Sequence, residues 1–136
     1  MATLMTTIQK ACRAKDLDLI RSCYDFDGAA DFPIDQDLNT WQEFWNENND
    51  TTHYVFEKID YQSLPDVQNN KTINPRAILA MIGPQKMGYH TYVPNLPVIG
   101  FITIHFKEGS SSTGTTQPVG LAPDGTAKIV VLRQAP

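Results

Sequence analysis

The sequence is poor in the residues that build metal centres and disulfide frameworks. It has two cysteines, Cys12 and Cys23, and three histidines, His53, His90 and His105, among 136 residues. Two cysteines are too few for a disulfide framework or a closed zinc site. The histidines show neither HxH nor HExxH spacing. We therefore expect no bound metal and two semi-buried thiols on neighbouring helices.

The chain also lacks a basic run, a long apolar run and a phosphate-binding glycine motif. Its eleven Lys and Arg are scattered and the net charge is −4, which argues against a nucleic-acid surface because phosphate binding needs clustered cations. No segment reaches the roughly 18–20 apolar residues that span a bilayer. The eight glycines form neither GxGxxG nor GxxxxGK(S/T). We expect no nucleic acid, no membrane span and no cofactor.

An export signal is not visible either, because MATLMTTIQK has no charged start followed by an apolar run. The expected location is cytoplasmic if Met1 is the native start, and exported if the chain was trimmed. Apolar residues make up 41% of the sequence and aromatic residues 10%. That suffices for a hydrophobic core, and the length suits a single domain over residues 1–136.

Three helices are predicted in the first third of the chain. Apolar residues recur there at steps of three and four, as on one face of a helix. Asp16 is a predicted N-cap for the second helix, which Gly28 ends. The third helix follows over Asp37 to Asn46 and turns Trp41 and Trp45 inward.

From residue 52 the apolar period changes to two, which predicts strands. In THYVFEKIDYQSL, alternation places Tyr54, Phe56 and Lys58 on one side and Val55, Ile59 and Tyr61 on the other. PDVQNNKTINP is a predicted polar loop, whereas NPRAILAMIG fits a short helix or a strand. Two extended runs, MGYHTYV and VIGFITIHF, flank a turn at Pro94 to Pro97.

The last part of the chain is predicted to contain a flexible loop and one strand. Residues 107–120 include GSSSTGTTQP, a composition typical of flexible segments. Pro123 to Gly125 marks a tight turn before the strand AKIVVLRQ. The predicted fold class is α+β, with N-terminal helices packed on a curved, mostly antiparallel sheet of about four strands.

This order of elements resembles the nuclear transport factor two-like superfamily, also called SnoaL-like. The resemblance is carried by AKDLDLIRSCYD, DLNTWQEFW, PVIGFITIHF and a closing strand. It implies a cone-shaped molecule with a pocket between the helices and a bent sheet. Fold membership by itself says little about function.

The ketosteroid isomerase branch of that superfamily provides a test of the segment from Tyr24 to Pro33. The branch has a segment of this length that starts with Tyr and ends in Asp-Pro, and that Asp is the catalytic base. Here the base position falls on Phe32, and Asp31 is one residue away, on the opposite face of an extended chain. Residues 1–15 contain no Tyr for the oxyanion. Isomerase chemistry of this type is therefore not expected.

The aspartates of CYDFDGAADFP do not form an EF-hand loop in any register. Counting from Asp25, position 5 is Ala29 and position 12 is Gln36, where oxygen ligands are required. Most of these carboxylates are expected to cap helices or face solvent. The catalytic candidates that remain are Asp27 and Asp31, if they turn inward toward His90 or His105.

The predicted ligand-binding residues are mainly aromatic. They would line one cavity if the helices cover the sheet face that carries His105, and otherwise they fill the core, with the histidines at its margin. This set consists of Trp41, Trp45, Tyr92, Phe101 and His105. If side chains alternate strictly along VIGFITIHF, Ile99 lies on the same sheet face as His105.

The function expected from the sequence is that of a non-catalytic binding or accessory protein. It would use a small pocket or an exposed apolar sheet face, and that face would form a homodimer. An enzyme is the less favoured interpretation. It would be a SnoaL-like lyase or isomerase in which a His–Asp or His–Tyr pair does acid–base work.

Overall fold

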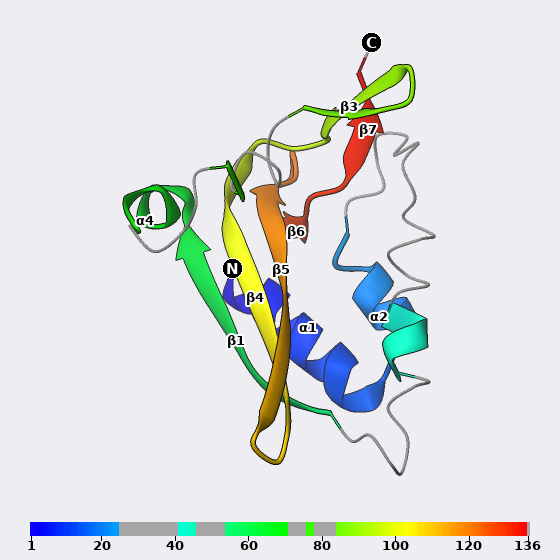
Figure 1. The fold of residues 1–136 in the computed structure, drawn as a ribbon, viewed down its shortest axis with the longest axis vertical. Coiled ribbons are helices and arrows are strands. Elements are labelled where there is room, and N and C mark those ends of the chain that lie inside the picture. Colours follow the sequence, from blue (N-terminus) through cyan, green and yellow to red (C-terminus); the bar gives the residue numbers. More distant parts are fainter. Residues whose placement is uncertain (25–40, 46–53, 71–75, 78–83, 136) are drawn as a thin grey trace.

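The computed structural model describes residues 1–24, 41–45, 54–70, 76–77 and 84–135 (Figure 1). The helices are α1 (Ala2–Ala14), α2 (Leu17–Arg21) and α4 (Leu64–Asn69), and residues 41–45 are also helical. The strands are β1 (Val55–Ser63), β2 (Gln85–Met87), β3 (His90–Pro94), β4 (Val98–Glu108), β5 (Ser111–Leu121), β6 (Ala127–Ile129) and β7 (Leu132–Gln134). The predicted α+β class, with N-terminal helices packed on an antiparallel sheet, is confirmed.

The first two helices meet at a sharp junction. Lys15 ends α1 in the left-handed conformation, at φ 53°, and the backbone N–H of Asp16 donates to the Ala11 carbonyl at 2.9 Å. The Asp16 side chain then accepts from the Leu19 N–H at 3.1 Å, so Asp16 is the N-cap of α2, as predicted. This junction brings the apolar faces of both helices onto the same core.

The strands form two sheets. The main sheet has the order β1-β4-β5-β6 with antiparallel pairing, and a smaller sheet has the order β2-β3-β7. The expected single strand at the end of the chain is instead divided between the two sheets. Asn95 stabilises the crossing, because its side-chain oxygen accepts from the Val131 N–H at 3.0 Å and its own N–H donates to the Val131 carbonyl at 2.8 Å.

Two bulges change which residues face the core. The register shifts between Phe56 and Lys58 in β1 and between Val98 and Gly100 in β4, so Glu57 and Ile99 are extra residues. The predicted alternation in β1 is therefore wrong. Four residues that it placed on opposite sides all pack on the main core: Tyr54, Phe56, Ile59 and Tyr61. Ile99 likewise joins the main core, on the side away from Phe101.

The core lies between the helices and one face of the main sheet (Figure 1). The sheet contributes Ile102, Ile104 and Phe106, and we call the surface that they form the inner face. Phe101 points to the opposite, outer face, where Val67 of α4 packs against it. The helix α4 replaces the start of the loop predicted over PDVQNNKTINP. Ser63 caps it by accepting from the Asp66 N–H at 3.4 Å.

The flexible loop predicted over residues 107–120 is also corrected. The strand β4 runs to Glu108, and β5 occupies Ser111–Leu121 in register with it. Threonine is β-branched and favours strands. The hydroxyls of Thr103 in β4 and Thr116 in β5 form a hydrogen bond at 3.1 Å. The pairing surface of β4 therefore orders a segment whose composition alone is typical of a linker.

The turn predicted at Pro123–Gly125 is present. Asp124 accepts from the Thr126 hydroxyl at 2.6 Å and from its N–H at 2.9 Å, and these hydrogen bonds lower the pKa of the Asp124 carboxyl. Gly125 adopts φ 86°, which L side chains rarely take. Across the described ranges, no helix has the length and apolarity that crossing a bilayer requires.

Candidate functional site

A cavity of about 150 Å³ lies between the helices and the inner face of the main sheet. We call it the aromatic pocket. Four rings form one part of its lining, those of Tyr24, Trp41, Phe44 and Phe106. The rest comes from β5, through Thr113, Gly114, Thr115 and Gln117.

The ring wall is fixed by a buried hydrogen bond. The indole Nε1–H of Trp41 donates to the Tyr24 hydroxyl at 3.0 Å, and the two side chains are 7% and 3% exposed. Tyr24 is itself anchored to the sheet, because it bridges Ile129, whose N–H donates to the Cys23 carbonyl at 2.7 Å. The wall is therefore held by β6 as well as by the helices.

Phe44 and Phe106 complete this wall. Their ring centroids are 4.8 Å apart, and Phe106 also meets Trp41 edge-on at 6.2 Å. Centroid separations and tilts of this kind are the favourable ones for aromatic pairs. Phe44 is only half-buried, so the wall has one ring that reaches solvent.

The polar wall consists of alternate residues of β5. Thr113, Thr115 and Gln117 stand opposite Phe106, Ile104 and Ile102 respectively, and share their face. The Gln117 amide donates to the Thr115 hydroxyl at 3.0 Å. Among the described residues that line the pocket, none carries a charge. The chemistry that it offers is ring stacking together with neutral hydrogen-bond donors and acceptors.

Sequence reasoning missed these three polar residues. They lie in TGTTQP, which reads as part of a linker when only composition is considered. Their spacing of two, in a run rich in β-branched residues, was a signal for a strand with one face directed at the core.

The structure does not bring the predicted ligand-binding residues together. Trp41 and Trp45 lie on the helical side, with ring centroids 5.4 Å apart. Phe101 and His105 lie on the outer face, and Tyr92 belongs to the small sheet. The shared cavity required the helices to cover the face that carries His105, and they cover the opposite face, so the condition for it is not met.

The remaining predicted residues are also dispersed. His90 is exposed on β3 and meets Tyr92 edge-on at 6.5 Å. Asp27, Asp31 and His53 lie outside the described residues. Within those that are described, no group of three or more His, Cys, Asp or Glu side chains is arranged to hold a metal ion.

His105 has a carboxylate partner on the outer face. Its Nε2 lies 2.9 Å from Oδ2 of Asp60, and the Lys58 ammonium is 3.7 Å from the same oxygen. The His105 and Asp60 side chains are 29% and 54% exposed. The pair therefore has the composition of an acid–base dyad but faces solvent instead of an enclosed cavity.

The two thiols are poor nucleophiles in this setting. Burial raises the pKa of Cys12 from 9.0 to about 12, and that of Cys23 from 9.0 to about 11. Both remain neutral near pH 7, and thiol chemistry proceeds through the thiolate.

Comparisons with protein-family models, with curated proteins and with solved structures give no match for this chain. The observed order, N-terminal helices followed by an antiparallel sheet, is compatible with the topology of the nuclear transport factor two-like superfamily.

Proposed function

We propose that the protein is a non-catalytic binding protein that holds a small planar ligand in the aromatic pocket. The observation that carries this proposal is the pairing of a ring wall with a neutral polar wall around one cavity. A planar molecule gains stacking from Trp41 and Phe106, and Thr115 and Gln117 can hydrogen-bond its edge. Pockets of this kind, mostly apolar with a few placed polar groups, are typical of small-molecule sites.

The same proposal includes membership of the nuclear transport factor two-like superfamily. Its support is the element order and the position of the cavity between the helices and the sheet. A pocket at that position is what the resemblance implies.

The test uses the two tryptophans as reporters, since Trp41 and Trp45 are the only ones in the chain. Neutral ring compounds such as p-cresol, benzamide and nicotinamide are titrated while intrinsic fluorescence is recorded. We expect saturable quenching that Thr115→Val weakens by about fivefold, because a hydrogen bond contributes roughly 1 kcal/mol.

Thr116→Val is the matched control, because Thr116 neighbours Thr115 in β5 but bonds Thr103 on the outer face. Its affinity should equal that of the wild type. Absence of quenching across the panel, or equal loss in both variants, contradicts the proposal.

The homodimer is likewise proposed, with the outer face of the main sheet as the contact. Phe101 and Val98 pack with Val67 of α4, and beyond them the described part of this face presents polar residues such as Thr103, Thr116 and His105. The contact proposed here is therefore polar, unlike the exposed apolar face expected from the sequence. A contact on such a surface is expected to be hydrated and modest in area.

A second function is favoured by one contact, the 2.9 Å hydrogen bond between His105 and Asp60. In this proposal His105 is the base of a lyase or isomerase and Asp60 orients its ring. Exposure of both side chains weakens this proposal, since water competes for the transferred proton. Solvent-deuterium exchange at the α-carbon of a simple ketone, followed by NMR, tests it. The exchange should be faster with wild type than with His105→Gln.

A further inference from the structure

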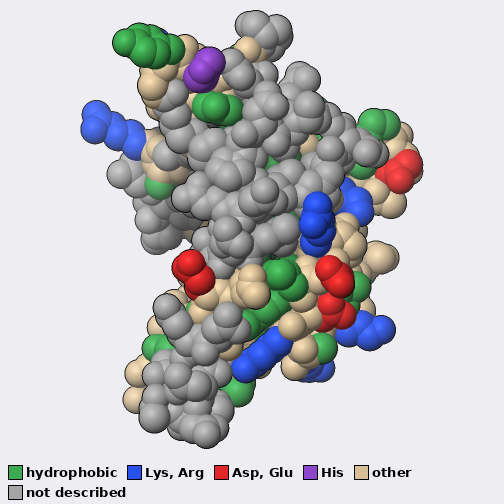
Figure 2. Space-filling model, turned by 90° about the vertical axis from the view of Figure 1, so that its right-hand side faces the viewer, with side chains coloured by type: hydrophobic (Ala, Val, Ile, Leu, Met, Phe, Trp, Pro, Cys, Tyr) green, Lys and Arg blue, Asp and Glu red, His purple; other side chains and the backbone are tan. Residues whose placement is uncertain are grey.

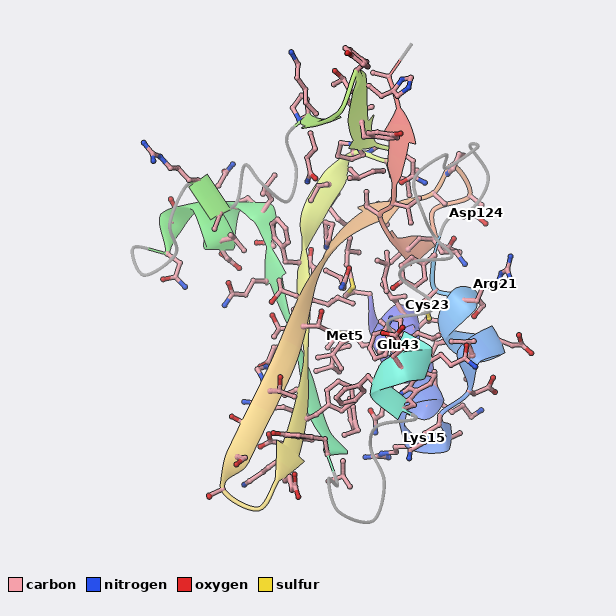
Figure 3. The ribbon with its side chains drawn as sticks, turned by 45° about the vertical axis from the view of Figure 1, so that its right-hand side comes forward. Met5, Lys15, Arg21, Cys23, Glu43 and Asp124 are labelled. Carbon is pink, nitrogen blue, oxygen red and sulfur yellow. The ribbon has the colours of Figure 1, made fainter. Side chains whose placement is uncertain are left out.

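A second cavity, of about 260 Å³, shares Phe44 and Phe106 with the aromatic pocket as lining residues. We call it the basic pocket. Its cations, Arg13 and Lys15, come from the C-terminal end of α1, and its walls are largely aromatic, with Trp45, Tyr54 and Phe56. Figure 3 shows Lys15 at the end of α1, close to the helix of residues 41–45. The two cavities therefore share a wall of two rings but differ in charge.

Arg13 is held at this pocket by its neighbours. Its guanidinium carbon lies 5.6 Å from the centroid of the Phe56 ring, within the range of a cation–π contact. With the Gln9 amide oriented so that its oxygen faces Arg13, that oxygen accepts from both terminal nitrogens at 2.8 and 2.9 Å. Neither neighbour carries a charge, so these two contacts orient the guanidinium without neutralising it.

No carboxylate of the described part of the chain lines the basic pocket or forms an ion pair with Arg13. Cys12 also lines it, and burial raises the pKa of this thiol to about 12, so it adds no negative charge near pH 7. Two cations therefore border a cavity with apolar walls in a chain whose net charge is −4.

A simpler role for the cations is to stabilise the end of α1, where partial negative charge accumulates on the last carbonyls. That role accounts for basic residues in the last turn and at the cap. It does not account for a cavity lined by Phe44, Tyr54 and Phe56 beside them.

We propose that the basic pocket binds a small organic anion, a carboxylate attached to an aromatic or aliphatic body. The carboxylate contacts Arg13 and Lys15, since guanidinium geometry suits carboxylate oxygens. The apolar body lies against Phe44, Tyr54 and Phe56. This site is distinct from the aromatic pocket, whose described lining is uncharged, and does not require a ligand there.

The experiment compares 4-phenylbutyrate with its neutral amide, 4-phenylbutyramide, by isothermal titration calorimetry with the full chain at low salt. The two probes have nearly the same shape and differ in charge. We expect the amide to bind about tenfold more weakly, because a hydrogen bond to a charged group contributes roughly 1.5–3 kcal/mol. Raising the salt concentration should weaken binding of the acid and leave the amide unaffected.

Arg13→Gln should weaken binding of the acid by about tenfold, with the amide unchanged. Lys10→Gln is the matched control, because Lys10 is an exposed cation of α1 that lines neither cavity. It should leave the affinity within about twofold of wild type. If Arg13→Gln fails to fold, Arg13→Lys and the acid–amide comparison on the wild type still decide the question.

Equal affinity for the acid and the amide overturns the proposal, as does an equal loss in the Lys10 and Arg13 variants. Failure here is separable from failure of the aromatic-pocket proposal. Thr115→Val should leave 4-phenylbutyrate binding unchanged, whereas Arg13→Gln should leave quenching by neutral rings unchanged.

Discussion

Single residues of the site differ in how well their polar atoms are satisfied. Trp41 has the Tyr24 hydroxyl as its acceptor. The Trp45 Nε1 is buried, and no acceptor for it exists among the residues that the structure describes. Both residues read alike in the sequence, as aromatics on the inner face of a helix. Hydrogen-bond satisfaction depends on atoms that only the fold brings near.

We predict that Tyr24→Phe destabilises the protein by roughly 1–3 kcal/mol, because it leaves the buried Trp41 N–H without this acceptor. Urea unfolding followed by circular dichroism measures the change. The double variant Tyr24→Phe, Trp41→Phe should cost less than the sum of the two single changes, since the second substitution removes the unpaired donor. Additive losses would show that the hydrogen bond carries no coupling energy.

The buried thiols predict a dependence of stability on alkaline pH. In the folded chain their pKa values, about 12 for Cys12 and about 11 for Cys23, exceed the ordinary value of 9.0. Above pH 9 the unfolded chain therefore loses protons first, and the free energy of unfolding falls as pH rises. The slope is up to about 1.4 kcal/mol per pH unit for each thiol.

Urea titrations between pH 8 and 11 measure this slope. Replacing both cysteines by alanine should reduce it, while lysines and tyrosines, which also titrate there, contribute equally to both proteins. An unchanged slope in the alanine variant would contradict the buried-thiol account.

At the scale of elements, the bulges decide which residues of a strand belong to the core. Glu57 is the extra residue of β1, and it lets Phe56 and Ile59 face the same side although they are three apart. Alternation identifies a strand from the sequence. It cannot locate a bulge, because a bulge depends on the partner strand.

We predict that deleting Glu57 alone is tolerated, whereas deleting Glu57 and Lys58 together is strongly destabilising. Deleting Glu57 alone leaves Phe56 and Ile59 two apart, on one face of a regular strand, whereas deleting both residues makes them adjacent and turns one of them outward. Removing one such side chain from the core costs roughly 2–5 kcal/mol. Thermal unfolding of both variants measures the difference, and equal melting temperatures would contradict the position of the bulge at Glu57.

Close packing of β1 against β4 also makes Gly100 sensitive to substitution. A Cβ there would lie 2.5 Å from the Gln62 carbonyl oxygen and 2.7 Å from the Tyr61 ring, whereas at Gly114 the nearest atom is 3.2 Å away. We expect Gly100→Ala to cost roughly 1–3 kcal/mol and Gly114→Ala clearly less. Chemical denaturation of the pair tests this, and the reverse order would contradict the packing around Gly100.

At the scale of the whole molecule, the chain carries charges of both signs, with eleven Lys and Arg against fifteen Asp and Glu. Figure 2 shows acidic and basic side chains interspersed on the described part of one face. The charged cluster of Lys58, Asp60 and His105 lies on the outer face, where dimerisation is proposed.

We predict a particle of twice the mass of the chain in sedimentation equilibrium, with an association that depends on salt because the proposed contact is polar. Asp60→Asn should weaken the association while changing monomer stability by less than about 1 kcal/mol, as exposed ion pairs contribute little. A monomer at all accessible concentrations would contradict the dimer.

The sequence by itself determined the elements whose cause is local. Apolar spacing and the Asp16 cap identified α1 and α2, and alternation identified β1, β3 and β4. The PDG turn follows from glycine and aspartate chemistry at that point. These features depend on residues a few positions apart, and the interactions that stabilise them lie within the same segment.

The tertiary structure alone decided which sheet face the helices cover, and hence where the site lies. Ile102 and His105 stand on opposite faces of one strand, and both faces carry apolar residues, so periodicity cannot choose between them. Contacts between separate segments of the chain likewise order β5 against β4 and place Arg13 over the Phe56 ring. Such contacts cannot be predicted from either segment alone, because the conformation of each segment depends on the packing surface of the other.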